Sequence, residues 1–418
     1  MRFGSLLPAF LMAFAGAFAP ASVAQDKPAL PDQPAAQDKP LVQAKPAVPE
    51  KPAVEAQADP QVKQAARGLI EEVLQITHAA DISRDLRLTL REVYIPAVRD
   101  FVMGNTPGVP APDPKSAAAA AKLLTFMDYA RKAGDELDVA VAENREAMIS
   151  DLAGQMAKSA KAADIEGVRA TLKLPAVTKG LDALYAVTRL LTGFSYEDSR
   201  TFSAFSAWAS RQDLDLPKSF PGMPQSGEAV PPKQKIAKAQ ALVSDFLSIS
   251  HLDEMVEDTH RFVRDVYAET APIPEEDRQA LREQADQFEF LYNMQKAVVM
   301  AAAPSVVAAT LTDDQLAMLQ GFVRSASFGK LCGLLRNSVK AGTAFTKDDI
   351  LEAKKSFEDL EKQAKSQQRN AAEEDKVKAE WDALTDKWTE ILKNRISPET
   401  RSGLDHALEE LKDEGAPI

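Results

Sequence analysis

Apolar residues recur at intervals of three and four from residue 62 to 211, with alanine, leucine and charged residues between them. This is the period of helices with one buried face, and the alternation that would predict strands is missing. The pattern resumes over 233–337, after the proline-rich stretch LPKSFPGMPQSGEAVPP. We therefore predict an all-α protein with two helical-bundle domains, 61–212 and 234–342, joined by a linker over 213–233.

The two predicted domains begin with related segments. LIEEVLQITHAADISRDLRLTLREVY, from Leu69, aligns without a gap with LVSDFLSISHLDEMVEDTHRFVRDVY, from Leu242, at an offset of 173. The shared residues are Leu69/Leu242, Leu74/Leu247, Ile76/Ile249, His78/His251, Asp85/Asp258, Arg91/Arg264, Val93/Val266 and Tyr94/Tyr267. Eight identities in 26 positions predict an internal duplication of one helical unit.

A second pair of segments is similar at a different offset. GFSYEDSRTFSAFSAW (Gly193–Trp208) aligns with TLTDDQLAMLQGFVRS (Thr310–Ser325) at an offset of 117. Ser195 and Thr312 are placed as helix N-caps, with acids in the first turn that follows. The drop from 173 to 117 predicts about 56 extra residues in the first copy. We expect them to include the loop GNTPGVPAPDP and a helix over 116–133.

The predicted tail, 343–418, is long and charged. Val377, Trp381, Leu384, Trp388 and Ile391 follow one another in steps of four and three, which is typical of a coiled-coil or helical-hairpin seam. Such a seam needs a partner face, either within the chain or from a second copy. We predict Trp381, Leu384, Trp388 and Ile391 as partner-binding residues.

Both repeated segments resemble a family of exported bacterial proteins classed as a domain of unknown function. LQITHAAD and LSISHLDE resemble the family's helix that ends in a leucine–threonine–glycine-like break before an acid, with His78 and His251 in place of the glycine. LTDDQLAMLQGFVRSASFGK, from Leu311, resembles its later helix, L-[ST]-x-x-[EQ]-L, an aromatic and a Ser-Pro-x-Gly-Lys ending; here the proline is absent. The resemblance implies a helical fold and brings no known catalytic residues. It leaves out the tail.

The chain begins with a predicted secretion signal. An apolar run from Leu6 to Ala19 precedes Ser22-Val23-Ala24, which predicts cleavage after residue 24 and a periplasmic or secreted protein. Retention of this run as a membrane tether is the alternative. Residues 25–60 are rich in proline, alanine, lysine and glutamine and predict a disordered spacer. After removal of the signal we expect no membrane-spanning segment.

Charge, cysteine content and the absence of known motifs argue against a nucleic-acid partner, an internal disulfide, a metal and a cofactor. The formal net charge of −12 argues against nucleic acid, which requires basic surfaces. With one cysteine, Cys332, the chain cannot form an internal disulfide, so an apolar core must hold it together. The four histidines form no metal-binding motif, and no phosphate loop or dinucleotide fingerprint is present, so we predict neither a metal nor a cofactor.

The repeated polar residues are the candidate ligand-binding positions. Arg91 with Tyr94, and Arg264 with Tyr267, occupy the same place in each copy, and arginine recognises carboxylates well. The alternative is structural: the valines and tyrosines of these segments pack inward while the arginines pair with surface acids. We predict a non-catalytic envelope interaction protein that binds another envelope protein or associates with itself through the tail. The other possibilities are a small-ligand module using these four residues and a cell-envelope hydrolase.

Overall fold

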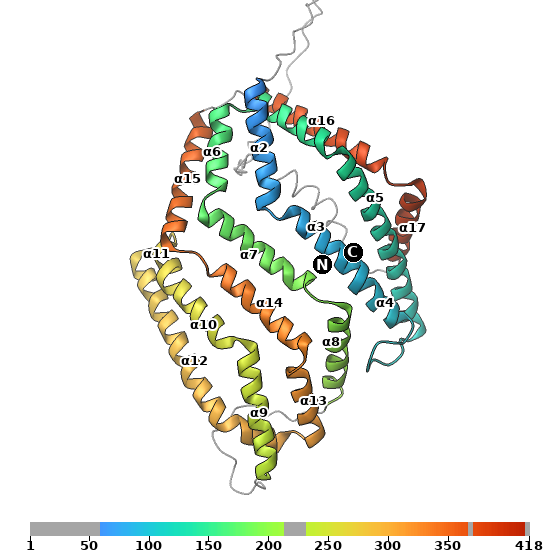
Figure 1. Cartoon of the computed structure of the whole chain (residues 1–418), viewed down its shortest axis with the longest axis vertical. Coiled ribbons are helices and arrows are strands. Elements are labelled where there is room, and N and C mark those ends of the chain that lie inside the picture. Colours follow the sequence, from blue (N-terminus) through green and yellow to red (C-terminus); the bar gives the residue numbers. More distant parts are fainter. Residues whose placement is uncertain (1–58, 213–230, 367–370, 414–418) are drawn as a thin grey trace, which may run out of the picture.

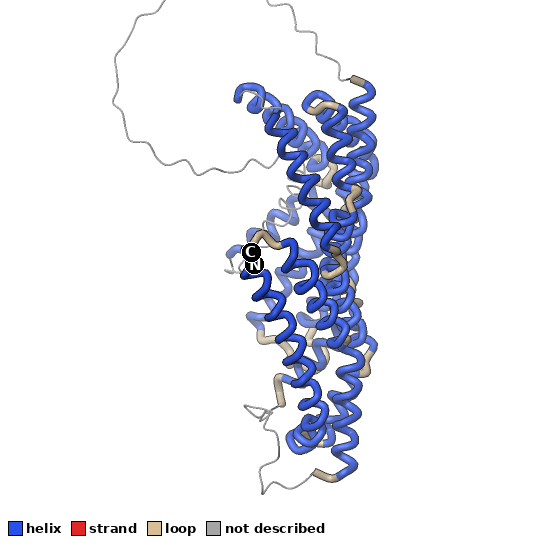
Figure 2. The backbone as a smooth tube through the Cα atoms, turned by 90° about the vertical axis from the view of Figure 1, so that its left-hand side faces the viewer, coloured by secondary structure: helices blue, strands red, loops and turns tan. Residues whose placement is uncertain are grey.

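The computed structural model describes residues 59–212, 231–366 and 371–413 (Figure 1). Every regular element in these ranges is a helix, which confirms the all-α prediction. The predicted signal peptide, all but the last two residues of the spacer, and residues 213–230 of the linker lie outside them. Edge-on, the helices form a flat assembly that is much longer than it is thick (Figure 2).

The described helices divide into three groups, which we name unit 1, unit 2 and the tail. Unit 1 comprises α2 (Pro60–Ile76), α3 (Ala79–Thr89), η2 (Leu90–Tyr94), α4 (Ile95–Val102), α5 (Pro114–Ser159), α6 (Ala162–Leu172), α7 (Pro175–Thr192) and α8 (Tyr196–Ala209). Unit 2 comprises α9 (Lys233–Ser250), α10 (Leu252–Arg261), η3 (Phe262–Tyr267), α11 (Ala268–Thr270), α12 (Glu275–Thr310), α13 (Asp313–Val323), α14 (Ala326–Gly342) and α15 (Lys347–Ser366). From here on the tail means α16 (Ala371–Lys393) and α17 (Pro398–Asp413) alone, because α15, which lies in the predicted tail 343–418, is grouped with unit 2.

Both units break their first long helix at a histidine. His78 and His251 have φ of 52° and 53°, the left-handed conformation that non-glycine residues rarely adopt. About three turns further along, each unit contains a π-helical segment, η2 and η3, at the repeated Arg-x-Val-Tyr sequence. The backbone therefore has the same two irregularities at positions that are 173 residues apart.

The helices in the second half of each unit follow one another in the same order at an offset of 151. α6 and α13 have 11 residues each, and their first residues, Ala162 and Asp313, are 151 apart. α7 and α14 follow at the same offset, and α8 then corresponds to α15. The predicted helix over 116–133 is part of α5. An offset of 151 gives unit 1 an extra length of 22 residues, against about 56 for the predicted offset of 117.

Three segments carry a similar cap, so the caps alone do not decide which helices correspond. Ser195 and Thr312 are both N-caps with reciprocal capping boxes, as expected, but Thr346 at the start of α15 also exchanges hydrogen bonds with Asp349. Only the packing identifies Thr346 as the counterpart of Ser195. α8 lies against α14, and α15 lies against α6 and α7, so each unit places its last helix on the other.

Reciprocal contacts at this offset join the two units. Lys330 of unit 2 donates to Asp198 of unit 1, and the corresponding Lys179 of unit 1 donates to Asp349 of unit 2. Phe205 stacks on Phe322 with ring centroids 3.7 Å apart. Ser356 corresponds to Phe205 and Thr171 to Phe322, and these two residues form a hydrogen bond. Gln315 donates to Gln212, and the corresponding contact runs between Gln363 and Asp164. α7 and α14 pack together between these contacts (Figure 1).

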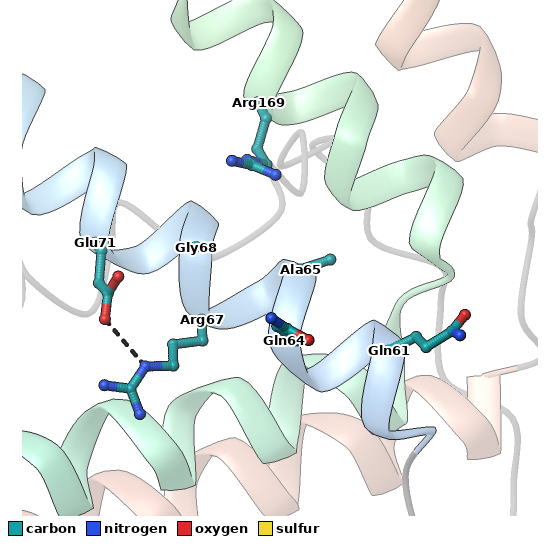
Figure 3. Close-up of a pocket in the computed structure, with 7 residues that line it drawn as sticks. All are labelled: Gln61, Gln64, Ala65, Arg67, Gly68, Glu71 and Arg169. Atoms are coloured by element: carbon teal, nitrogen blue, oxygen red, sulfur yellow. Dashed lines mark hydrogen bonds and ion pairs between the residues drawn. The ribbon is translucent and has the colours of Figure 1, made fainter.

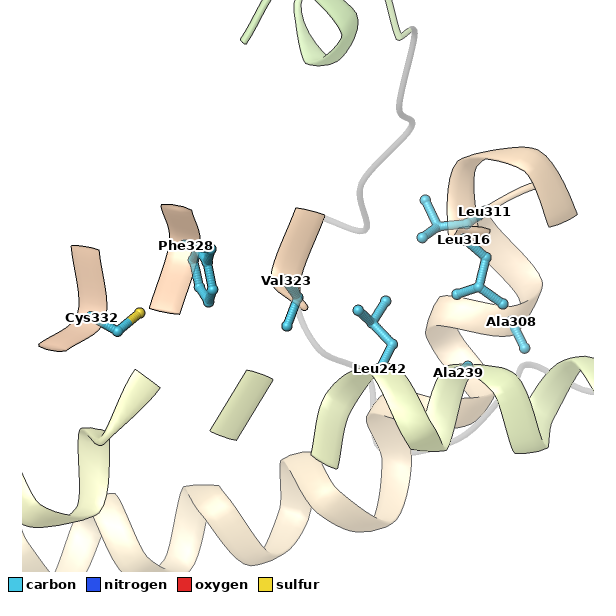
Figure 4. Packing of buried hydrophobic residues seen from close by; sticks show 8 residues of the cluster. All are labelled: Ala239, Leu242, Ala308, Leu311, Leu316, Val323, Phe328 and Cys332. Atoms are coloured by element: carbon cyan, nitrogen blue, oxygen red, sulfur yellow. The ribbon is translucent and has the colours of Figure 1, made fainter. Parts of the chain in front are cut away.

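Each unit has its own apolar core. In unit 2, Ala239, Leu242 and Leu316 are buried with Val323, Phe328 and the single cysteine, Cys332 (Figure 4). In unit 1, Ala66, Leu69 and Ile165 are buried at the corresponding positions. Burial raises the pKa of the Cys332 thiol, which here serves as a small apolar side chain.

Candidate functional site: the outer face of α12

The repeated arginines and tyrosines lie at the surface of their own units. Tyr94 and Tyr267 are 48% and 47% exposed, while Val93 and Val266 point inward from the same π-helical turns. Arg91 and Arg264 are exposed too, and Arg264 pairs with Asp286 of α12 at 3.3 Å. None of the four predicted ligand-binding residues lines either of the two cavities described below. Their role as a ligand site stays a prediction.

The tail seam packs inside the chain. Trp388 is buried, and Trp381, Leu384 and Ile391 are half-buried, because α16 lies against α5. Polar contacts fix this packing: Lys387 donates to Asp151, and Gln155 donates to Glu380. The seam therefore meets a partner face within the chain.

α17 continues along the same helix. Arg395, in the turn before α17, pairs with Glu143 at 3.0 Å. Glu136 accepts hydrogen bonds from the backbone N–H of Ser397 and from the hydroxyls of Ser397 and Thr400. The bond from the Ser397 N–H contributes most to holding the pKa of Glu136 below its usual range. α5 is thus covered by α16 and α17 along one charged face.

α12 lies at the place in unit 2 that α5 has in unit 1, and none of the described helices covers it in this way. Ser159 and Thr310, where the two helices end, are 151 residues apart, and α12 packs on α9, α10, η3 and α11 within unit 2. It forms an outer edge of the assembly (Figure 1). We define the α12 face as the row of exposed, uncharged residues Gln287, Phe290, Leu291, Met294, Val298 and Ala301.

The α12 face is apolar and exposed. Phe290 is 67% exposed, Leu291 and Met294 are each 47% exposed, and Val298 is 51% exposed. Scattered surface apolar residues are ordinary, but a contiguous row of large ones usually marks an interaction site. Phe288, 55% exposed, lies beside the row.

The positions that bind the tail on α5 are uncharged on α12. Glu136, Glu143 and Asp151 correspond to Gln287, Met294 and Ala302. From residue 284 to the end of α12 the charged residues are Asp286, Glu289 and Lys296. They pair with side chains of α10 and η3: Asp286 and Glu289 with His260, and Lys296 with Asp253. The α12 face itself carries no charge.

Two open cavities occur elsewhere. One, of 480 Å³, lies between α2 and α6 and is lined by Gln61, Gln64, Ala65, Arg67, Gly68, Glu71 and Arg169 (Figure 3). Its arginines are already paired, Arg67 with Glu71 and Glu146, and Arg169 with Glu72 and Glu166. The hydrogen bond from Arg169 contributes most to lowering the pKa of Glu72 to about 2. Two of these ion pairs, Arg67–Glu146 and Arg169–Glu72, connect α2 to α5 and to α6.

The second cavity lies where the 103–113 loop approaches α8. It has a volume of 600 Å³ and is lined mainly by Phe202, Ala207, Val109, Pro110 and three serines. Arg211 donates to the carbonyl oxygen of Gly108 across it. Gly104 and Gly108 have positive φ, which gives the loop its turns.

Several acidic side chains join one helix to another. Burial alone would raise the pKa of Asp85, but Arg189 and Tyr185 of α7 bind it and lower its pKa. The pKa of Asp138 is raised, because burial together with the nearby Asp135 carboxylate outweighs the effect of Arg87. Within residues 59–212, 231–366 and 371–413, no group of three or more His, Cys, Asp or Glu side chains is arranged to hold a metal ion. No helix in those ranges combines the length and apolar character needed to cross a bilayer.

Comparison with known proteins gives no match among protein-family models, curated proteins or solved structures. The resemblance to the exported bacterial family therefore stays a prediction.

Proposed function

We propose that the protein is an exported, non-catalytic helical interaction protein that binds a partner through the α12 face. The observation that carries the proposal is the difference between two corresponding helices. α5 is covered along one face by α16 and α17, whereas on α12 Leu291 and Met294, the counterparts of Ala140 and Glu143, are exposed, and Val298 extends the exposed row. An exposed helical row of this kind suits a helix-to-helix interface, where apolar residues three and four apart anchor the contact.

The proposal includes a duplication of one helical unit. Its support is the matching histidine breaks and π-helical segments, together with the reciprocal pairs Lys330–Asp198 and Lys179–Asp349. In this interpretation the first copy acquired the tail as a partner for α5. The second copy kept an open helix for a separate partner.

Export and a role in the cell envelope rest on the N-terminal sequence. The apolar run before Ser22-Val23-Ala24 supports secretion, and the proline-rich residues 25–60 suit an extended spacer between the signal and the helical part.

A photo-crosslinking amino acid at position 291 tests the proposal in native extract of cells that express the protein. The matched control carries the same group at Val139 of α5, which is 59% exposed and corresponds to Phe290. A discrete adduct from position 291, absent from position 139 and lost when Met294→Glu is added, supports a partner-binding α12 face. No adduct from position 291, or the same adducts from both positions, contradicts it.

A further inference from the structure

The α12 face has the spacing of a helix-pairing seam. Gln287, Leu291, Met294 and Val298 follow one another in steps of four, three and four, and Ala301 continues the row. An average step of 3.5 residues keeps a row of side chains facing a second helix over several turns. The seam is long enough for a helix, and its centre lies near Met294.

Charge distinguishes among the possible occupants. The tail of another copy is unsuited, because Lys387 and Arg395 need the acids that α5 supplies as Asp151 and Glu143. The corresponding residues of α12, Ala302 and Met294, offer those cations no partner. The occupant must therefore present an uncharged, apolar helical face.

A second copy of this chain presents such a face on its own α12. With a net charge of −12, two copies repel one another over most approaches, and an uncharged face is where that repulsion is least. Two-fold association through one patch, in which the same residues meet from both sides, is the commonest form of self-association. An antiparallel arrangement places Met294 near its own counterpart and Leu291 near Val298.

We propose that the chain forms a two-fold dimer in which the α12 faces of two copies pack antiparallel. This rests on the proposed function and names its partner. Exposed Phe290 and Leu291 become buried in the dimer, which completes for α12 the cover that α16 and α17 give α5 within the chain.

Sedimentation velocity of the purified full chain, from about 1 to about 100 µM, tests the proposal over the range of ordinary protein affinities. The wild type is expected to approach the dimer mass as its concentration rises. Leu291→Glu with Met294→Glu places four carboxylates in the interface of each dimer and is expected to raise the dissociation constant by on the order of 100-fold or more. Val139→Glu adds a charge to the corresponding helix of unit 1 and is expected to leave the dimer intact.

A cysteine at the centre of the seam gives a second readout that does not depend on a disruptive change. Met294→Cys is expected to form a disulfide between two copies under mild oxidation, while Val139→Cys does not, and the native Cys332 is buried. A wild type that stays monomeric at 100 µM overturns the proposal, as does a dimer that persists in the double Glu variant. A monomer whose position 291 crosslinks to a different protein overturns self-association and leaves the proposed function supported.

Discussion

Lys330 on α14 donates a hydrogen bond of 2.7 Å to Asp198 on α8, so this ion pair joins unit 2 to unit 1. The Asp198 carboxylate also accepts from Ser327 and caps α8 together with Ser195. At the corresponding positions Lys179 reaches Asp349 at 2.5 Å, in the opposite direction between the units. The first ion pair attaches α8 of unit 1 to unit 2, and the second attaches α15 of unit 2 to unit 1.

Removing the Lys330 ammonium is expected to destabilise the whole chain. Lys330→Met leaves the buried Asp198 carboxylate without its cation and should lower the free energy of unfolding by about 2 kcal/mol. Urea denaturation followed by circular dichroism measures the change. Lys238→Met is the control, because its pair with Asp313 is exposed on both sides and should contribute less than about 1 kcal/mol. Equal effects of the two substitutions would contradict the role of Lys330.

The same ion pair predicts a dependence on pH. Burial alone would raise the pKa of Asp198, but hydrogen bonds from Lys330, Ser195 and Ser327 outweigh burial and hold the pKa well below its usual range. A carboxylate with a lowered pKa contributes stability fully above its unfolded pKa of about 4 and loses it as the pH falls further. The stability difference between wild type and Lys330→Met should therefore be constant above about pH 5 and shrink below about pH 4. A difference that grows on acidification contradicts the assignment.

Replacing His251 with glycine is expected to stabilise unit 2. The left-handed backbone at φ 53° costs a non-glycine residue on the order of 1 kcal/mol, and glycine adopts it freely. His78→Gly should gain less, because the His78 ring stacks on Tyr185 at 4.6 Å and reaches Asp182. Thermal denaturation of both variants compares them. A lower melting temperature for His251→Gly than for wild type would show that its contact with Glu254 outweighs the backbone strain.

Gly193 is expected to tolerate no side chain where α7 passes α14. A Cβ atom there would lie 2.5 Å from the Arg189 carbonyl oxygen and 2.7 Å from Leu334. Gly193→Ala should cost about 1–3 kcal/mol through displacement of α7 or α14. Gly342→Ala is the matched control, since nothing lies within 4 Å of its added Cβ, and it should be neutral or slightly stabilising. Chemical denaturation of the two variants measures the contrast.

Trp388→Ala is expected to destabilise the chain without changing its oligomeric state. Trp388 is 8% exposed in the packing of α16 on α5, so truncation should cost about 3 kcal/mol or more. Phe357→Ala, 54% exposed on α15, is the control and should change stability by less than about 0.5 kcal/mol. Denaturation and light scattering on both variants separate the effects. A change of mass in Trp388→Ala alone would place the interface on the tail.

Hydrophobic periodicity was sufficient to predict that the chain is helical, and capping residues were sufficient to predict where several helices begin. Ser195 and Thr312 cap helices as predicted, because a hydroxyl followed three residues later by Asp or Gln satisfies local backbone groups without help from elsewhere. The break at the repeated histidines was also visible, since both copies shared it. These features depend on residues close together in the chain.

Corresponding helices in the two units could not be assigned from caps alone. Ser195, Thr312 and Thr346 look alike locally, and only the crossing bridges Lys330–Asp198 and Lys179–Asp349 pair α8 with α15. The one sequence signal that could have found this is weak: GFSYED and AFTKDD share a Phe and an Asp at equal spacing.

The sequence by itself determined the helical class, the repeated segment at an offset of 173 and the apolar seam of the tail, because each is a periodic or local pattern. Only the tertiary structure decided which apolar row is covered. The Trp381–Ile391 row and the Leu291–Val298 row both step by four and three, so periodicity cannot separate them. α5 offers the first row a face with matching charges, while the described helices leave the second exposed. Burial depends on which helices meet, and that is fixed by contacts between residues far apart in the chain.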